Sequence, residues 1–218
     1  AVFVSGGGNL IVPYSLMYGA DSVVVIDSKG KARSVQGIVG LDEMYDCVRV
    51  RVAADKKISH LPVSSAPVSV GDELYMLSYG KKNSGEVHRV KVSAVDSLYS
   101  HAYYTLNVGI REGYEGLPLV NDKGEMVALM QPSSTGDTCS YAIGATVYDN
   151  LVATSATYGL GYYSGMGLRT LLPEEKEAAL SCMYMRAMFG DKSTFVNVVD
   201  DFIAAFPTSY EGYVSKAE

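Results

Sequence analysis

The chain has 218 residues, of which 48% are hydrophobic and 19% are charged, an ordinary balance for a globular protein of one or two domains. The net charge is -6 and no run of Lys or Arg forms a basic stripe, which argues against nucleic-acid partners. No apolar run approaches the roughly 20 residues that cross a bilayer. The three cysteines, Cys47, Cys139 and Cys182, lack metal-ligand spacing, and we expect no metal and no cofactor.

Short strands separated by turn residues follow one another up to about residue 150. Residues 23–26 precede a turn cluster at 27–30, and residues 48–52 alternate as a half-buried strand does. Strand patterns recur at 73–77, at 87–95 and on both sides of a hairpin signal at 121–124. Many short strands without βαβ alternation predict a mainly β domain, a sandwich or barrel, over residues 1–150.

The periodicity changes after a stretch rich in Gly, Tyr and Ser, which we interpret as a linker over residues 151–170. Pro173 and the acids that follow it open a helix, and Gly190 ends that helix. Residues 193–206 predict a second helix, and a third begins near Tyr210. We therefore expect a helical segment over residues 171–218.

Three stretches of the β region resemble trypsin-fold serine proteases of the HtrA/DegP type. They cover residues 1–20, residues 37–50, and residues 113–130 followed by 141–144. In the third, Gly113-Tyr114-Glu115-Gly116-Leu117-Pro118-Leu119-Val120 is similar to the family's nucleophile segment, Gly-Asn-Ser-Gly-Gly-Pro-Leu-Val. The resemblance implies a trypsin-like double β-barrel, with two six-stranded barrels that divide near residues 60–68 and a cleft between them.

The catalytic triad does not carry over intact to this chain. A serine hydrolase needs a nucleophile, an imidazole base and a carboxylate that orients the imidazole. The family's histidine position falls on Ser15, its aspartate on Asp46, and its nucleophile on Glu115. Asp46 is therefore expected either to hydrogen-bond Ser15 or nearby backbone, or to be a remnant without a role.

No histidine stands at a catalytic position in the sequence. His60 lies in the expected connection between the barrels, His88 lies in an alternating strand and is expected to face solvent, and His101 is near a strand start. A carboxylate near its usual pKa is a poor base for a serine hydroxyl, so Asp46 and Glu115 are weak substitutes. The sequence therefore indicates a protease fold that lacks the residues for serine-protease catalysis.

Glu115 also bears on the oxyanion hole, which in the family is built from backbone N–H groups at the positions of Gly113 and Glu115. Two interpretations stay open. The Glu115 carboxylate fills the hole itself, or the loop has relaxed and Glu115 faces solvent.

The helical segment is similar to tetratricopeptide repeats. Residues 195–207 are similar to the second helix of a repeat, with Pro207 closing the unit, and residues 209–218 are similar to the first helix of the next. The alternative is a pair of amphipathic helices that pack on the second barrel. At least three repeats are normally needed to bury a continuous core, so a repeat array would imply a longer parent chain.

The favoured hypothesis is an inactive protease homologue, a pseudoprotease, that binds an extended peptide or a partner protein. Strand addition beside residues 131–143 is the expected route. The alternatives are a divergent serine endopeptidase, a hydrolase that uses Asp46 and Glu115 as an acid/base pair, and a β domain that only caps a repeat array. The resemblance implies a location outside the cytoplasm, periplasmic or secreted. The expected oxyanion-hole and substrate-strand positions are Gly113, Tyr114, Glu115, Gln131, Tyr141, Ala142 and Ile143.

Overall fold

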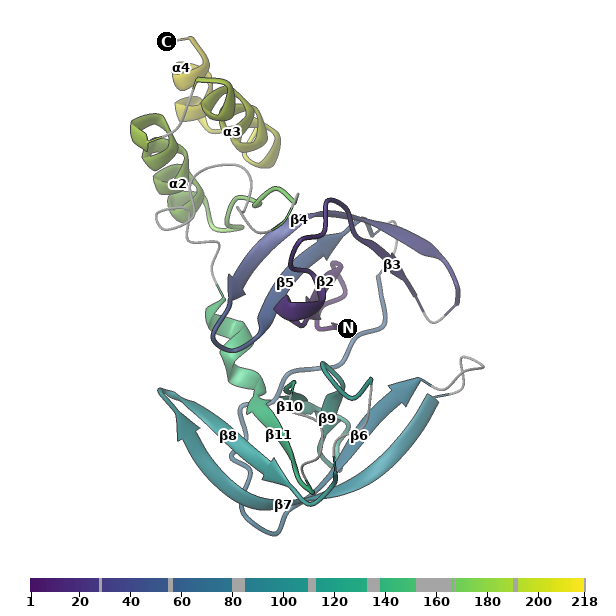
Figure 1. Ribbon diagram of the computed structural model, residues 1–218. Coiled ribbons are helices and arrows are strands. Elements are labelled where there is room, and N and C mark those ends of the chain that lie inside the picture. The colour runs from purple at the N-terminus through teal and green to yellow at the C-terminus, as the bar shows by residue number, and fades with distance from the viewer. Residues whose placement is uncertain are drawn as a thin grey trace.

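A computed structural model describes residues 1–27, 29–54, 57–79, 85–109, 113–132, 138–151, 166, 168–189 and 192–217. Three units follow one another in space (Figure 1). A first β-sheet lies in the middle, a β-barrel lies on one side of it, and three helices lie on the other. The mainly β fold class with a helical C-terminal segment is confirmed. None of the described helices is long and apolar enough to cross a membrane.

The first sheet is antiparallel and open, with the strand order β1-β2-β5-β4-β3. The alternating Val residues of β5 point their side chains into the core of the first sheet. Val48 and Val50 are fully buried there beside Leu10 and Ile38. The resemblance implied a six-stranded barrel here, whereas the described residues form five strands without closure. The strands are β1 (Val2–Phe3), β2 (Asn9–Val12), β3 (Val24–Ile26), β4 (Ala32–Asp42) and β5 (Cys47–Val52).

The second sheet is a closed barrel with the strand order β10-β11-β8-β7-β6-β9. The predicted hairpin at 121–124 joins β9 to β10, and the Asn121 side chain accepts backbone hydrogen bonds from Lys123 and Glu125 across that turn. The barrel core contains Met76, Leu106 and Leu119. The strands are β6 (Glu73–Tyr79), β7 (Gly85–Leu98), β8 (His101–Leu106), β9 (Pro118–Val120), β10 (Met126–Met130) and β11 (Ser140–Gly144).

A separate apolar cluster joins the two sheets. Ile11 and Cys47 of the first sheet pack there with Leu129 and Ile143 of the barrel. Cys47 is thus the small core residue that the sequence predicts. A short 3-10 helix, η2 (Ala145–Asn150), follows β11, and Arg49 of β5 donates to the carbonyl oxygens of Tyr148 at 3.2 Å and Leu151 at 2.8 Å. The first sheet is therefore tied to the end of the barrel.

Three antiparallel-packed helices complete the chain: α2 (Lys176–Phe189), α3 (Lys192–Ala205) and α4 (Tyr210–Ala217). Phe202 is fully buried between them, together with Met183 and Val198. Gly212 allows α4 to approach α3, because a Cβ there would lie 2.8 Å from the Ile203 side chain. The predicted end of the first helix, Gly190, lies outside the described residues.

Part of the predicted linker docks on the first sheet through an isolated parallel β-bridge between Thr170 and Ile38. Arg169 accepts a backbone hydrogen bond from Ile38 of β4 at 2.8 Å, and Leu171 donates one to Ile38 at 2.7 Å. Gly37 permits this, since a Cβ there would lie 2.6 Å from the Arg169 carbonyl oxygen. The interpretation of 151–170 as a linker stays a prediction, since 152–165 and 167 lie outside the described residues.

Two ion pairs connect the helical segment to the first sheet and the residues docked on it. Arg51 of β5 pairs with Glu174, and Arg169 pairs with Asp201 of α3 at 3.1 Å. The alternative interpretation placed the helices on the second barrel. Because two charged pairs and a backbone β-bridge lead to the first sheet instead, that placement is wrong for the contacts described.

Candidate functional site

Ser15 and Asp46 lie in direct contact at the edge of the first sheet. Ser15 is part of a 3-10 helix, η1 (Tyr14–Leu16), and Asp46 lies in the turn between β4 and β5. The Ser15 N–H donates to Asp46 Oδ1 at 2.6 Å, and the Ser15 Oγ donates to Asp46 Oδ2 at 3.0 Å. The prediction that Asp46 hydrogen-bonds Ser15 is confirmed.

The backbone around Asp46 is also held in place. Asp46 has a left-handed φ of +50°, which Asp adopts more readily than most residues. Its N–H donates to the Glu43 carbonyl, and its own carbonyl accepts from the Tyr14 N–H. The carboxylate is therefore aimed at Ser15 by fixed backbone and not by a flexible loop.

Burial raises the pKa of the Asp46 carboxyl above its ordinary value. The two hydrogen bonds from Ser15 act in the opposite direction, and the nearby negative charge of Glu115 adds to the increase. Ser15 and Asp46, from distant parts of the sequence, thus meet where the resemblance predicted two members of a triad.

Glu115 is positioned by a tight turn that contacts the first sheet. Gly113 and Gly116 have φ values of +85° and +71°. A Cβ on Gly116 would lie 2.4 Å from the Pro13 ring, so only glycine lets this turn rest against the segment that carries Ser15. The Gly116 N–H donates to the Met130 carbonyl at 2.9 Å, which fixes the turn to β10.

The side chain of Glu115 is half-buried, and within the described chain its carboxylate accepts no hydrogen bond. The turn's own amides therefore do not bind it, as they would if the carboxylate filled the oxyanion hole. No hydrogen bond of the described residues supports a Glu115 carboxylate that fills the oxyanion hole. The half-buried side chain does not decide for a relaxed loop with Glu115 in solvent either.

The expected substrate-strand positions divide into two groups. Ala142 and Ile143 are fully buried, and their backbone pairs with β8 on one side and β10 on the other. Gln131 and Tyr141 are half-buried, the Gln131 Nε2 donates to the Tyr45 carbonyl at 3.1 Å, and the Tyr141 ring stacks on Tyr103. Side-chain contacts with a ligand are thus open to Gln131 and Tyr141 but not to the other two.

None of the three histidines contacts Ser15, Asp46 or Glu115. His60 bonds the Ile58 carbonyl, and His101 packs edge-on against Tyr45. His88 is half-buried instead of facing solvent as expected, and its Nε2 lies 3.2 Å from Ser78 Oγ.

The pair of Ser78 and His88 does not have the arrangement of a catalytic triad. The carboxylate of Glu86 lies 3.5 Å from the same Nε2, so it competes with Ser78 for that nitrogen. In a triad the carboxylate bonds the other ring nitrogen and leaves Nε2 to accept the serine proton. Sequence reasoning missed this cluster, because Ser78 and His88 meet only across the β6–β7 ladder.

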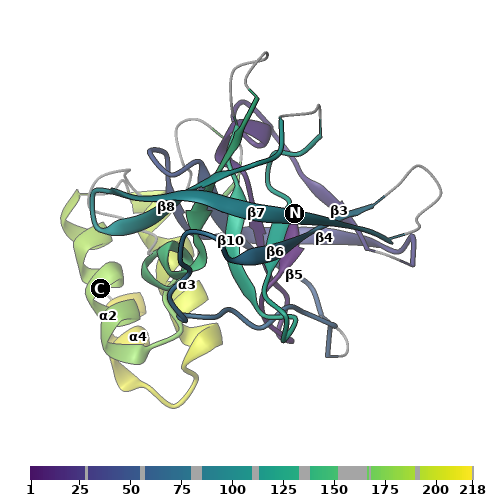
Figure 2. The ribbon, with the colours of Figure 1, turned by 90° about the horizontal axis from the view of Figure 1, so that it is seen from below.

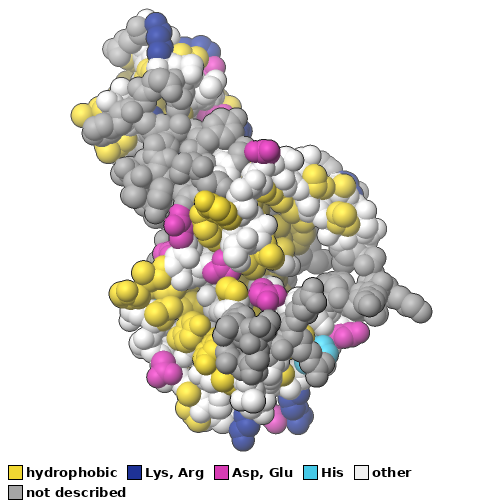
Figure 3. All heavy atoms as spheres, viewed as in Figure 1, with side chains coloured by type: hydrophobic (Ala, Val, Ile, Leu, Met, Phe, Trp, Pro, Cys, Tyr) yellow, Lys and Arg dark blue, Asp and Glu magenta, His cyan; other side chains and the backbone are white. Residues whose placement is uncertain are grey.

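The surface between the two sheets is acidic and apolar on the face shown in Figure 3, and Lys and Arg side chains appear toward its ends. Among the described residues, no group of three or more His, Cys, Asp or Glu side chains is placed to hold a metal ion. A pocket of about 390 Å³ lies elsewhere, between the first sheet and α3, and is lined by Gln36, Arg51, Arg169, Leu171 and Phe206 among others. It contains none of the predicted site residues.

The strand order and the contact between Ser15 and Asp46 are those expected of a trypsin-like fold. A sequence model of the trypsin-like peptidase domain matches residues 2–129, more than half of the chain. The chain belongs to that family. No curated protein sequence matches it significantly.

Solved structures show the same fold. A serine endoprotease from Yersinia pestis is 19% identical with a TM-score of 0.58, over 67% of this chain and 53% of that one. An inactive mutant form of protease Rv3671c from M. tuberculosis is 17% identical with a TM-score of 0.59, over 73% of this chain and 83% of that one. The chain thus spans about half the length of the Yersinia protein.

Proposed function

We propose that this protein is a catalytically inactive member of the family that binds an extended peptide, or an extended segment of a partner protein, in the cleft between its two sheets. The observation that carries the proposal is the bond between Ser15 and Asp46. The carboxylate that would orient an imidazole holds a serine hydroxyl, and a glutamate occupies the nucleophile position. Neither an imidazole base nor a nucleophile stands at its family position.

Exposed apolar side chains beside Ser15 and Asp46 support a binding role. Leu16 and Tyr18 are 66% and 67% exposed, and Met44, two residues before Asp46, is 57% exposed. Large apolar side chains grouped on a surface commonly mark a site of contact with another molecule. We call Leu16, Tyr18 and Met44 the apolar collar. Together with the acidic groups nearby, the apolar collar fits a peptide that carries apolar and basic side chains.

Because the barrel is closed, we propose side-chain contacts in place of the strand addition that the sequence predicted. Strand addition needs a free backbone edge, and β11 is bonded on both sides at Ala142 and Ile143. The proposed contacts are therefore side-chain contacts with Gln131, Tyr141 and the apolar collar of Leu16, Tyr18 and Met44.

The three helices extend the proposal to scaffolding. We interpret α2, α3 and α4 as tetratricopeptide-like helices, on the basis of the sequence similarity of residues 195–218 and the close packing at Gly212. The family resemblance favours a location outside the cytoplasm, periplasmic or secreted.

Binding and cleavage can be measured on the same peptides. Fluorescein-labelled unstructured peptides rich in Leu, Tyr and Lys are titrated with the protein while anisotropy is recorded, and mass spectrometry then checks whether they are intact. We expect saturable binding, intact peptides, and affinity about tenfold weaker in Tyr18→Ser. Tyr99→Ser is the control, because Tyr99 is 73% exposed in the turn between β7 and β8. Cleavage, or equal loss in both variants, would contradict the proposal.

A further inference from the structure

β3 (Val24–Ile26) ends the first sheet with one of its two edges unpaired. It bonds β4 on one side, and no other strand of the described chain pairs with its second edge. Figures 1 and 2 both show β3 on the side of the molecule away from the helices. An unpaired strand edge is a template for another chain, and proteins usually protect it with charges, proline or a cover.

The direction of the free backbone groups follows from the hairpin that joins β3 to β4. The Asp27 N–H donates to the Lys31 carbonyl at 3.0 Å, so these two residues form a hydrogen-bonded pair of the antiparallel ladder. Such pairs alternate with pairs that are not hydrogen-bonded to each other. Val25 therefore bonds toward β4, while the N–H and C=O groups of Val24 and Ile26 point to the open edge.

The side chains on this edge are apolar and exposed. Val24 and Ile26 lie on the same face of β3 and are 63% and 72% exposed, whereas Val25 packs on the first sheet's core. Two large β-branched side chains on an open edge are the opposite of the usual protection.

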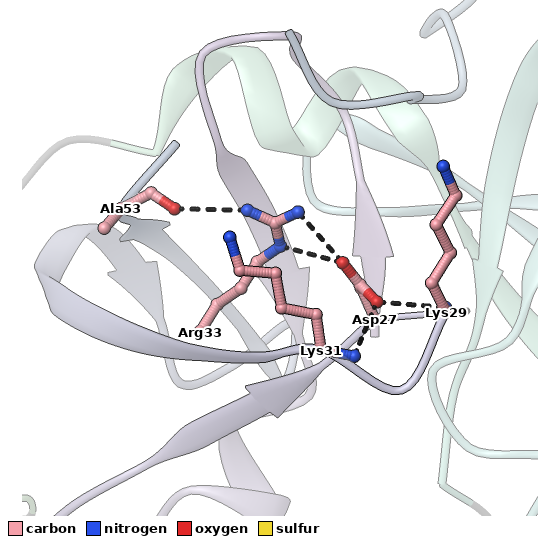
Figure 4. Close-up of polar contacts among 5 residues, drawn as sticks. All are labelled: Asp27, Lys29, Lys31, Arg33 and Ala53. Atoms are coloured by element: carbon pink, nitrogen blue, oxygen red, sulfur yellow. Dashed lines mark hydrogen bonds and ion pairs between the residues drawn. The ribbon is translucent and has the colours of Figure 1, made fainter. Parts of the chain in front are cut away.

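The hairpin is held firmly in this conformation (Figure 4). The Asp27 carboxylate accepts backbone hydrogen bonds from Lys29 and Lys31 and two bonds from the Arg33 guanidinium, at 3.1 and 2.9 Å. Arg33 also donates to the Ala53 carbonyl beyond the end of β5. The exposed edge is thus presented in one arrangement.

We propose that β3 pairs with β3 of a second copy of this chain, antiparallel and around a two-fold axis at Val25. In this register Val24 stands opposite Ile26 of the second copy, and the reverse pair forms on the other side of the axis. Both are residues whose backbone groups point outward, so four backbone hydrogen bonds form. The four exposed side chains meet on one face, and the two five-stranded sheets become one continuous sheet.

Charge complementarity identifies the occupant as a second copy. Asp21 and Lys29 flank the two ends of β3, and antiparallel pairing brings the Asp21 end of one copy beside the Lys29 end of the other, twice by symmetry. Both side chains are exposed, and neither has an ion-pair partner within the described residues. A two-fold interface must be self-complementary, and this edge meets that condition in its backbone, its apolar residues and its charges. Because the strand is short, the dimer is weak and depends on concentration.

Sedimentation velocity over a concentration series tests the proposal. The 218-residue chain has a mass of 23.4 kDa. We expect a reversible shift toward twice that mass, and no shift in Ile26→Lys, which places like charges on both sides of the axis. Val87→Lys is the control, since Val87 is 64% exposed on β7 of the barrel. A single monomer at every concentration, or a dimer that Ile26→Lys leaves intact, would overturn the proposal.

A charge exchange tests the antiparallel direction of the pairing. Asp21→Lys and Lys29→Asp, each alone, bring like charges together at both ends of the paired strands, and we expect dimerisation about tenfold weaker in each. The double variant restores opposite charges and with them the original dissociation constant. If the double variant dimerises more weakly than either single variant, the two residues do not meet, and the proposed pairing is overturned.

Discussion

The two β units of this protein differ in whether their sheets leave backbone edges unpaired. The second barrel closes on itself, so its strands bond neighbours on both sides. The first sheet stays open, and it supplies Ser15 and Asp46, whereas the barrel supplies Glu115. Closure removes edges, but an open sheet must cover them with other parts of the chain. Here residues 169–171 cover part of β4, and β3 is left bare. The open unit therefore carries both the link to the helices and the free edge.

The contact between the two units is most sensitive at Gly116. Gly116→Ala adds a side chain 2.4 Å from the Pro13 ring in a left-handed conformation, and we expect a loss of roughly 3–5 kcal/mol in the free energy of unfolding from strain and crowding together. Gly124→Ala is the matched control, because Gly124 has a similar φ of +76° with open space around it. Urea denaturation of both variants separates the crowding from the strain. Equal losses would mean that the units do not meet at Pro13.

The docking of the helices on the open sheet depends on Gly37. Gly37→Ala places a Cβ 2.6 Å from the Arg169 carbonyl, and we expect a cost of about 1–3 kcal/mol together with faster hydrogen exchange at the Leu171 amide. Barrel amides such as that of Met130 keep their protection. Gly85→Ala serves as control, since no atom lies within 4 Å of its added Cβ. Unchanged exchange at Leu171 in Gly37→Ala would show that the segment is not docked.

Two aspartates of the open sheet respond to pH in opposite directions. Backbone hydrogen bonds and Arg33 lower the pKa of Asp27, so its contribution to stability is present above about pH 4 and is lost as the pH falls through the lowered value. Burial raises the pKa of Asp46, so its proton is held more tightly in the folded chain, and stability falls as the pH rises through the raised value.

Melting temperatures between pH 3 and pH 7 test this contrast. Asp27→Asn is expected to melt lower than the unaltered chain at pH 7, with a smaller difference at pH 3. Asp46→Asn is expected to gain stability relative to the unaltered chain as the pH rises, since an amide keeps an acceptor for the Ser15 N–H without the charge. Parallel curves for both variants would contradict the assigned shifts.

Local patterns predicted β3, β5, β6, β7, β9 and β10, the hairpin at Asn121 and the three helices, because periodicity and turn residues determine these elements. The order of three weak motifs also brought Ser15, Asp46 and Glu115 together. The docking of Arg169 on β4 could not be predicted, since it depends on space beside Gly37 and not on a pattern near either residue. The burial of Ala142 and Ile143 likewise follows from closure of the barrel, which single strands do not encode.

The central claim is that the cleft lacks a working nucleophile and base, and labelling with a fluorophosphonate probe tests it directly. We expect no labelling of the unaltered chain. We expect labelling at position 115 when Ser15→His and Glu115→Ser are combined, because Asp46 is already placed to orient an imidazole. Labelling of the unaltered chain that either Ser15→Ala or Ser78→Ala abolishes would contradict the account.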